Sequence, residues 1–211
     1  MAALFAAAAA AQSRHPVSGR VIAQVMGYEG AAWLERPERE DEEQPSKAIV
    51  ALDIKPGQVV ADVGAGSGYY TVRLAERVGP TGRVFAADIQ PKMLDLLRAR
   101  VTRARLDQVE FVLSTKTDPG LPDGRFDLVL MVDVYHELAR PQEVLRKLRA
   151  SLKPDGRLVL IEFRKESAWV PIREEHKMSV TEARIELEAE GYRFDRVIDV
   201  LPWQHILVFR R

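Results

Sequence analysis

The stretch VADVGAGSGYYT, residues 60–71, joins an apolar, strand-like run to a glycine-rich turn. Within it an aspartate is followed by three alternating glycines, and the four residues are Asp62, Gly64, Gly66 and Gly68. Glycine accepts positive φ angles and lets a ligand approach the backbone closely. Residues 70–79 then place apolar side chains on one face of a predicted helix, whose first amides are free to bind a ligand. The stretch therefore predicts a strand, a ligand-binding turn and a helix.

Downstream, short apolar runs alternate with amphipathic segments, a pattern typical of buried strands and covering helices. The predicted strands are 58–63, 83–88, 109–113, 126–132 and 157–163, and the predicted helices are 46–54, 70–79, 91–101, 141–152 and 179–191. Two further strands, 193–200 and 204–210, have no helix between them and are expected to pair antiparallel. The alternation predicts a doubly wound α/β fold with a mostly parallel sheet and helices on both faces.

Size and charge limit the classes of function. A chain of 211 residues is long enough for one domain with a full core. Lys and Arg together number 31, as do Asp and Glu, and this balance argues against a nucleic-acid partner. The absence of cysteine excludes disulfides and thiolate chemistry, and no metal site is predicted. No run approaches the ~18 apolar residues that a membrane span needs.

Three segments are expected along the chain. Residues 1–18 are predicted to form a disordered tail or a signal-peptide remnant, 19–45 a helical extension or lid, and 46–211 the main domain. The alanine-rich start lacks the basic residues of a signal peptide, so a cytoplasmic location is expected, with export as the alternative. The charges within 31–40 are expected to form surface ion pairs, unless this segment covers the site.

A second acidic residue narrows the ligand. Asp88 ends the strand 83–88, twenty residues beyond Gly68, where a carboxylate can accept hydrogen bonds from ribose hydroxyls. The dinucleotide fingerprint G-x-G-x-x-G would need a third glycine at the position of Tyr69. A turn that need not hold a pyrophosphate, with an acid at its base, suits a nucleoside ligand without phosphates.

Four motifs in this order resemble those of class I S-adenosylmethionine-dependent methyltransferases: VADVGAGSGYYT, VFAADIQPKML, FDLVLMVDVYHEL and LKPDGRLVLIEF. The resemblance covers residues 46–211, the expected methyltransferase domain, and is strongest to a bacterial subgroup with small-molecule substrates. It implies a Rossmann-like, seven-stranded sheet, mostly parallel with an antiparallel last strand. It also implies S-adenosyl-L-methionine as cofactor and a small-molecule methyl acceptor, and leaves the oligomeric state open.

The resemblance also implies which residues hold the cofactor. Asp62 would hold its amino-acid end, Gly64 and Gly66 would pass beneath it, and Asp88 would bind its ribose. For the adenine amino group we expect Asp118, with Thr115 as the alternative. The full predicted set is Asp62, Gly64, Ala65, Gly66, Gly68, Asp88, Ile89, Asp118 and Asp133. Asp133 is expected to contact the cofactor's amino group, or else to cap the next helix.

Candidate catalytic residues follow the predicted strands 126–132 and 157–163. Methyl transfer is an in-line displacement that needs a positioned nucleophile, sometimes with a base to deprotonate it. His136 is the candidate base, and Tyr135 and His176 complete the predicted catalytic set. Glu162 and Arg164 are expected to pair either with substrate or with each other.

The acceptor is expected to be a small molecule with an O, N or S nucleophile. The chain lacks the N/D-P-P-Y/F signature that the resemblance would require for amide or base N-methylation. Two alternatives stay open at this point: a nicotinamide-dependent oxidoreductase, and a catalytically inactive cofactor-binding protein of the same fold.

Overall fold

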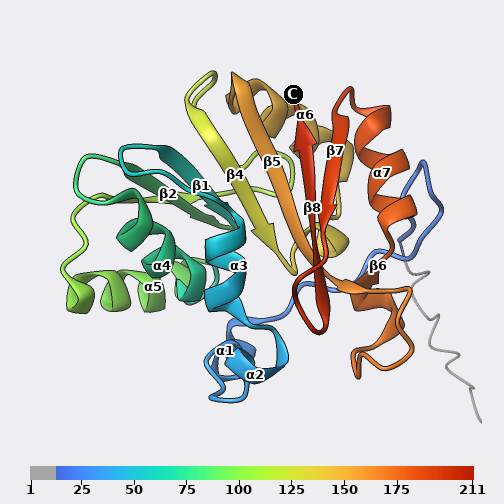
Figure 1. Cartoon of the computed structure of the whole chain (residues 1–211), viewed down its shortest axis with the longest axis horizontal. Helices are drawn as coiled ribbons and strands as arrows, with labels where there is room; N and C mark the ends of the chain where they lie inside the picture. The colour runs from blue at the N-terminus through green and yellow to red at the C-terminus, as the bar shows by residue number, and fades with distance from the viewer. Residues whose placement is uncertain (1–12) are drawn as a thin grey trace, which may run out of the picture.

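The computed structural model describes residues 13–211 and is built around one central sheet (Figure 1). The main strands are β1 (Val59–Val63), β2 (Arg83–Asp88), β3 (Val109–Leu113), β4 (Phe126–Val132), β5 (Leu152–Arg164), β7 (Arg193–Ile198) and β8 (Gln204–Arg210). Their order is β3-β2-β1-β4-β5-β8-β7; the pairs from β3 to β5 are parallel, and β8 runs antiparallel to both β5 and β7. The predicted seven-stranded sheet is confirmed, with a two-residue eighth strand, β6 (Lys177–Met178), paired beside β5.

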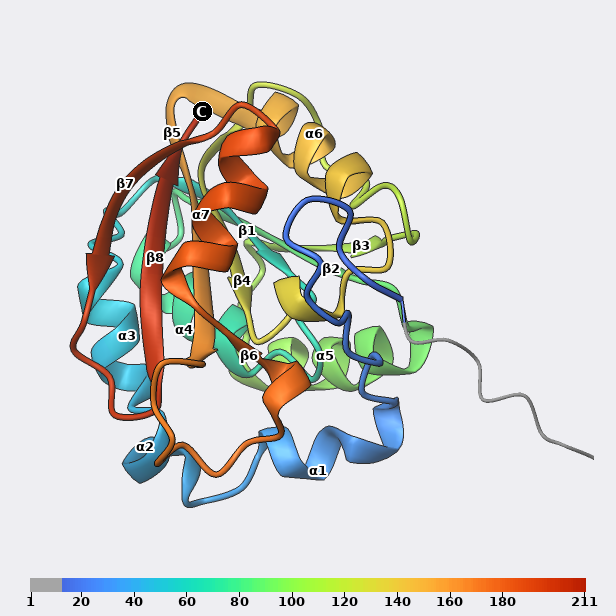
Figure 2. The same cartoon turned by 90° about the vertical axis from the view of Figure 1, so that its right-hand side faces the viewer.

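Helices cover both faces of the sheet, as the alternating pattern predicts (Figure 2). One face carries α3 (Pro45–Ala51), α4 (Tyr69–Val78) and α5 (Pro91–Ala104), and the other carries α6 (Pro141–Ser151) and α7 (Val180–Ala189). Each face has its own apolar core, because the strand residues alternate between the two sides. Ser179 and Glu182 form a capping box at the start of α7.

The parallel strands end together at one edge of the sheet. β1 pairs with β2 and β4 in register, with Asp62 opposite Ala86 on one side and Leu130 on the other. In Figure 1 the arrowhead of β4 points to the lower edge, where the short helices α1 (Ala31–Leu34) and α2 (Arg39–Glu42) lie. Side chains that follow the carboxyl ends of these strands therefore meet at this edge.

The strand β5 is longer than the sequence predicts. The predicted helix 141–152 and strand 157–163 leave residues 153–156 between them as a turn, but the structure has one strand from Leu152 to Arg164. Phe126 pairs with Leu152 and Leu128 with Arg157, so residues 153–156 form a bulge within the strand. Bulges insert unpaired residues without ending the pairing, which explains the difference.

The N-terminal segment is more ordered than predicted. His15 is only 1% exposed, and Arg14 forms an isolated antiparallel β-bridge with Val21. Ser18 and Arg20 both hydrogen-bond to Glu186 of α7. The prediction of a disordered tail is therefore wrong for residues 13–18, because buried polar contacts hold them against the domain. The rest of that prediction, including the signal-peptide alternative, falls on residues 1–12, outside the described part.

The next segment, 19–45, contains only short helices: η1 (Tyr28–Gly30), α1 and α2. Across residues 13–211, every helix is too short or too polar to cross a bilayer.

Candidate active site

A cavity of about 620 Å³ lies at the carboxyl edge of the sheet. Its walls come from the glycine turn after β1, the residues that follow β2 and β4, the N-terminal extension and the segment after β5. Seven predicted site residues line it: Gly64, Gly66, Asp88, Ile89, Asp133, His136 and His176. The cavity therefore joins the predicted cofactor-binding and catalytic residues in one space, of a size typical of small-molecule sites.

The glycine turn needs glycine for two reasons. Gly64 and Gly66 have φ angles of +74° and +54°, which L side chains rarely adopt. A Cβ atom on Gly64 would lie 2.4 Å from Cγ2 of Val134, and one on Gly66 would lie 3.0 Å from Cδ1 of Leu34. The turn thus passes close to the loop after β4 and to the N-terminal extension while keeping its backbone open to the cavity.

Asp88 ties the glycine turn to the end of β2. Its Oδ2 accepts a hydrogen bond from the amide of Gly66 at 2.8 Å, and its Oδ1 accepts one from the amide of Gln90 at 2.8 Å. Burial raises the pKa of the Asp88 carboxyl, although these amide hydrogen bonds oppose the rise. Each carboxylate oxygen retains a second lone pair for a ligand hydroxyl.

We expect Asp88→Ala to weaken S-adenosylhomocysteine binding by roughly 10- to 150-fold for each hydrogen bond lost. This range corresponds to about 1.5–3 kcal/mol for a hydrogen bond to a charged acceptor. Titration calorimetry checks the affinity, and Asp88→Asn, which keeps one acceptor oxygen, is the matched control with a smaller loss. An unchanged affinity in the alanine variant would remove Asp88 from the site.

Asp62 lies beneath the turn and does not line the cavity. Its Oδ2 accepts a hydrogen bond from the Thr71 hydroxyl at 2.6 Å, so it anchors the start of α4 to β1. Burial raises the pKa of Asp62 to about 6, and the nearby Asp88 adds to the rise while the Thr71 hydrogen bond opposes it. Its direct contact with the cofactor stays a prediction.

The raised pKa of Asp62 predicts that Asp62→Asn stabilises the protein at neutral pH. Because the folded-state pKa is above the unfolded value, folding favours the protonated acid, and this group's contribution to stability falls between about pH 4 and pH 6. At pH 7 the cost is about 3 kcal/mol, since one pKa unit corresponds to about 1.4 kcal/mol. Denaturant unfolding without cofactor, at pH 4.5 and 7, should show the variant's advantage growing with pH; a pH-independent difference would contradict the assignment.

Asp133 lines the cavity and has one buried oxygen that is unpaired within residues 13–211. Its Oδ2 accepts a hydrogen bond from Nε2 of Gln204 at 2.7 Å, while its buried Oδ1 has no partner among the described residues. The pKa of Asp133 lies well above its usual value because of burial, and the carboxylates of Glu43 and Glu162 add to the effect. The backbone at Asp133 has a φ angle of +53°, a strained conformation that is often found at functional sites.

Arg39 is a cavity residue that the sequence did not reveal. The charges of this segment were expected to lie on the surface, but Arg39 is 3% exposed and Glu43 is fully buried. The Arg39 Nε donates to Oε2 of Glu43 at 2.7 Å, and its guanidinium lies 4.4 Å from the centre of the Tyr69 ring. An Arg and a Glu four residues apart are typical of a solvated helix face, so the pattern carried no signal of burial.

His136 is held by a buried carboxylate. Its Nδ1 lies 2.5 Å from Oε2 of Glu162, whose other oxygen accepts the amide of Tyr135 at 2.9 Å. The opposite ring nitrogen, Nε2, lies 3.1 Å from Nδ1 of His176. Glu162 thus fixes the orientation of the imidazole, as a carboxylate does for a catalytic histidine. Glu162 and Arg164 do not pair with each other. Glu162 pairs with His136, and Arg164 pairs with Asp199.

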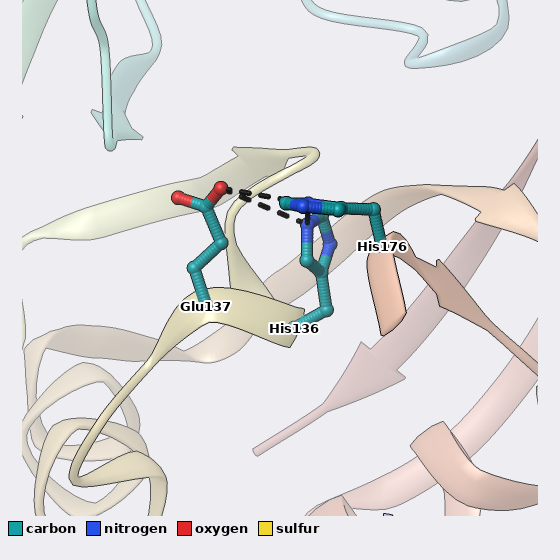
Figure 3. Close-up of side chains that lie close together, drawn as sticks. All are labelled: His136, Glu137 and His176. Carbon is teal, nitrogen blue, oxygen red and sulfur yellow. Dashed lines mark hydrogen bonds and ion pairs between the residues drawn. The ribbon is translucent and has the colours of Figure 1, made fainter. Parts of the chain in front are cut away.

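Glu137 is a second residue that sequence reasoning missed. Its Oε1 lies 3.9 Å from Nε2 of His136 and 3.8 Å from Nδ1 of His176, and it lines the cavity. Burial raises the pKa of the Glu137 carboxyl to about 7, with the charge of Glu162 adding to the effect and His136 opposing it. Burial lowers the pKa of His176. Figure 3 shows the three side chains turned toward one another from η2 (Tyr135–Glu137) and η3 (Glu174–His176).

Two predicted site residues do not line the cavity. The Tyr135 side chain is fully buried away from the cavity, with its hydroxyl 3.4 Å from Nε2 of His15, so a catalytic role is not supported. Asp118 does not line the cavity, because its Oδ1 accepts the amide of Gly120 and its Oδ2 lies 3.5 Å from Nζ of Lys147. Thr115, the alternative to Asp118, does line the cavity.

Two other predicted cofactor residues lie behind the cavity wall. The amide of Ala65 donates to the carbonyl of Ala87 at 3.0 Å, and the amide of Gly68 donates to the carbonyl of Ala65 at 3.0 Å. Gly68 caps α4 with a φ angle of +86°, and a Cβ there would lie 2.8 Å from Cγ of Leu97. Both residues therefore hold the conformation of the turn without lining the cavity.

The sheet order, the glycine turn and the acid after β2 define a Rossmann-like nucleotide-binding protein. The residues present fit S-adenosylmethionine. The backbone of Gly64 and Gly66 lines the cavity without side chains, Asp88 offers acceptors for hydroxyls, and Asp133 adds a carboxyl group to the cavity lining.

Comparison with known proteins agrees with this class. A family model described as a methyltransferase domain matches residues 61–160. A solved S-adenosylmethionine-dependent methyltransferase from Aquifex aeolicus is 30% identical, with a TM-score of 0.82 over 88% of this chain and 98% of that one. The chain therefore belongs to the S-adenosylmethionine-dependent methyltransferases, and S-adenosylmethionine is its cofactor. Neither the oxidoreductase nor the inactive binding protein gains support from these matches.

Similarity to curated sequences is more limited in extent. The ubiquinone/menaquinone biosynthesis C-methyltransferase UbiE of Hydrogenovibrio crunogenus is 35% identical over 119 residues, which cover 56% of this chain and 47% of that protein. The chain thus spans about half the length of the curated relatives it matches. A methyltransferase of Haloferax volcanii, solved in complex with its Trm112 activator, shares the fold alone, at 20% identity with a TM-score of 0.67 over 87% of this chain and 96% of that one.

Proposed function

We propose that this protein transfers a methyl group from S-adenosylmethionine to a small molecule whose hydroxyl, amine or thiol is deprotonated at His136. The observation that carries the proposal is the pairing of His136 with Glu162 beside the cavity that also holds the glycine turn. S-adenosylmethionine supplies a methyl group on a positively charged sulfur, which an in-line nucleophile displaces.

The residues of the chain divide this work between two ends of the cavity. In this proposal the glycine turn and Asp88 form the cofactor end, and Asp133 and Arg39, which line the same cavity, bind the ammonium and the carboxylate of the cofactor. His136 and His176 form the acceptor end, together with the segment after β5. Glu162 fixes Nδ1–H of His136 as a donor, so the lone pair of Nε2 faces His176, 3.1 Å away, and accepts the acceptor's proton once the acceptor displaces this contact.

The curated relatives favour carbon as a further atom that could receive the methyl group. UbiE is named a C-methyltransferase of quinone biosynthesis, and a deprotonated ring hydroxyl makes the adjacent ring carbon nucleophilic as well as the oxygen. The same base at His136 therefore serves methylation on oxygen or on a neighbouring ring carbon. We accordingly place hydroxylated rings first among the acceptors, ahead of amines and thiols.

The decisive experiment is a screen of small phenols, hydroquinones, amines and thiols for release of S-adenosylhomocysteine, with mass spectrometry to locate the new methyl group. A thermal-shift comparison of S-adenosylhomocysteine with NAD precedes it. Stabilisation by NAD alone would contradict the proposal, and cofactor binding without transfer to any acceptor would favour a binding protein.

A cytoplasmic location also remains a proposal. It rests on the expectation that a protein using S-adenosylmethionine stays where the cofactor is made. Cell fractionation that finds a cleaved, exported form would overturn it.

A further inference from the structure

The geometry points to a site for one divalent transition-metal ion, held by Nε2 of His136, Nδ1 of His176 and Oε1 of Glu137. These three ligand atoms lie within 4.8 Å of one another at the acceptor end of the cavity (Figure 3). Two imidazoles and a carboxylate are the donor set that proteins use for Fe²⁺, Zn²⁺ and related ions with open coordination positions.

The spacing of the nitrogens fits a shared ion. Metal–ligand distances of about 2.1 Å place neighbouring ligand atoms about 3.0–3.4 Å apart in octahedral or tetrahedral geometry. Nε2 of His136 and Nδ1 of His176 are 3.1 Å apart, and their rings are nearly perpendicular, at 83°. The carboxylate oxygen, at 3.8 Å and 3.9 Å from these nitrogens, needs to move inward by roughly half an ångström to reach the same ion.

A second, independent feature supports the site. Ligating histidines in metalloproteins usually donate their other ring N–H to a carboxylate, which fixes the tautomer and strengthens the ligand. Glu162 takes this position at 2.5 Å from Nδ1 of His136, and its own second oxygen is held by the Tyr135 amide. The Nε2 lone pair of His136 is thereby directed away from Glu162, toward His176 and Glu137.

The charge balance also favours a cation. Glu162 is fully buried and Glu137 largely so, yet among residues 13–211 neither carboxylate forms an ion pair with a lysine or arginine. Asp133 adds a further buried carboxylate nearby, whereas Glu43 is already paired with Arg36 and Arg39. Buried charges are normally paired or bound to metals, so an ion between the histidines and Glu137 would balance this excess.

Three protein ligands leave at least one position of the ion open to the cavity. If the proposed function is correct, an oxygen of the acceptor fills that position. With Nε2 of His136 bound to the ion, His136 would hold the ion instead of accepting the proton itself. The ion would lower the pKa of the bound hydroxyl and stabilise its oxygen anion, and the proton would pass to solvent. Hydroxylated rings or enols suit such a site, because an oxygen anion on the ion keeps further lone pairs and activates the adjacent carbon, whereas the one lone pair of an amine would be taken up by the ion.

Metal binding is tested on chelator-stripped, full-length protein prepared without a polyhistidine tag. Calorimetry with Zn²⁺ and Mn²⁺, and visible absorption with Co²⁺, should show one ion per chain. His176→Asn and Glu137→Gln should each weaken binding by more than about tenfold, because removing a ligand costs at least as much as removing its supporting partner. These two residues are chosen because they face the cavity, whereas a substitution of buried His136 would leave Glu162 unpaired.

Glu175→Gln is the matched control. It makes the same change of charge as Glu137→Gln, beside His176, but Glu175 does not line the cavity. Its affinity for the ion should remain within about twofold of the wild type. Failure of the wild type to bind any of the three ions, or equal binding by the wild type and both ligand variants, would overturn the metal site.

The two proposals fail separately. Methyl transfer at full rate by the stripped protein would disprove the role of the ion and leave the proposed function standing. Conversely, ion binding that the ligand variants lose, together with no transfer to any acceptor, would leave the metal site standing without the methyltransferase function.

Discussion

His136→Ala is expected to lower turnover by about 10²- to 10⁴-fold, the usual range for loss of a group that moves a proton in the transition state. Affinity for S-adenosylhomocysteine should change little, because the proposed function assigns His136 to the acceptor and Asp88 to the cofactor. Steady-state release of S-adenosylhomocysteine and calorimetry measure the two quantities separately.

His136→Gln discriminates between chemistry and packing. Glutamine can keep a hydrogen bond to Glu162, so it avoids much of the cost of a buried unpaired carboxylate, which the alanine variant incurs in full. It supplies neither a base nor a strong metal ligand, so its turnover should be as low as that of His136→Ala. Near-normal turnover in the glutamine variant would show that His136 only orients the substrate or packs.

His15→Gln is the control for changing a buried histidine. His15 is 1% exposed, like His136, but it contacts Tyr135 and Glu186 outside the cavity. This variant is expected to lose stability without losing turnover per folded molecule. The comparison separates the loss of a functional group from the loss of a buried ring.

Most of the fold could be predicted because it depends on local patterns. Apolar runs, helix periodicity and the glycine turn are written into short stretches of sequence, and the helix-less end predicted the antiparallel strand β8. The continuous strand β5 was missed because a Pro-Asp-Gly sequence suits both a turn and a bulge. Only pairing with β4, a contact distant in sequence, decides between them.

The site was predictable where it follows a strand end and unpredictable where it depends on side-chain direction. Tyr135 and His136 are adjacent, yet the turn η2 sends Tyr135 into the core and His136 toward the cavity. Nothing in the sequence distinguishes these two directions. The contact between Glu137 and His176 joins segments 39 residues apart, and the burial of Arg39 depends on how the extension packs on the domain.

Gly66→Val is expected to abolish measurable cofactor binding. The backbone at Gly66 has a φ angle of +54°, and its amide is fixed by Asp88, so the residue cannot easily adopt another conformation. A valine there must bear the strain of a positive φ, about 1–3 kcal/mol, which is worse for a β-branched residue. Its Cβ would also lie 3.0 Å from Leu34, where the turn borders the cavity.

Gly124→Val is the control variant for the effect of backbone strain alone. Gly124 has a similar φ angle of +64°, no atom within 4 Å of an added Cβ, and no place in the cavity wall. This variant should lose comparable stability in denaturant unfolding and still bind S-adenosylhomocysteine with ordinary affinity. If Gly66→Val also binds normally once its folded fraction is taken into account, the turn is not the cradle of the cofactor. Loss of binding in Gly66→Val alone assigns the effect to the close approach between ligand and backbone, the reason we infer for a glycine at this position.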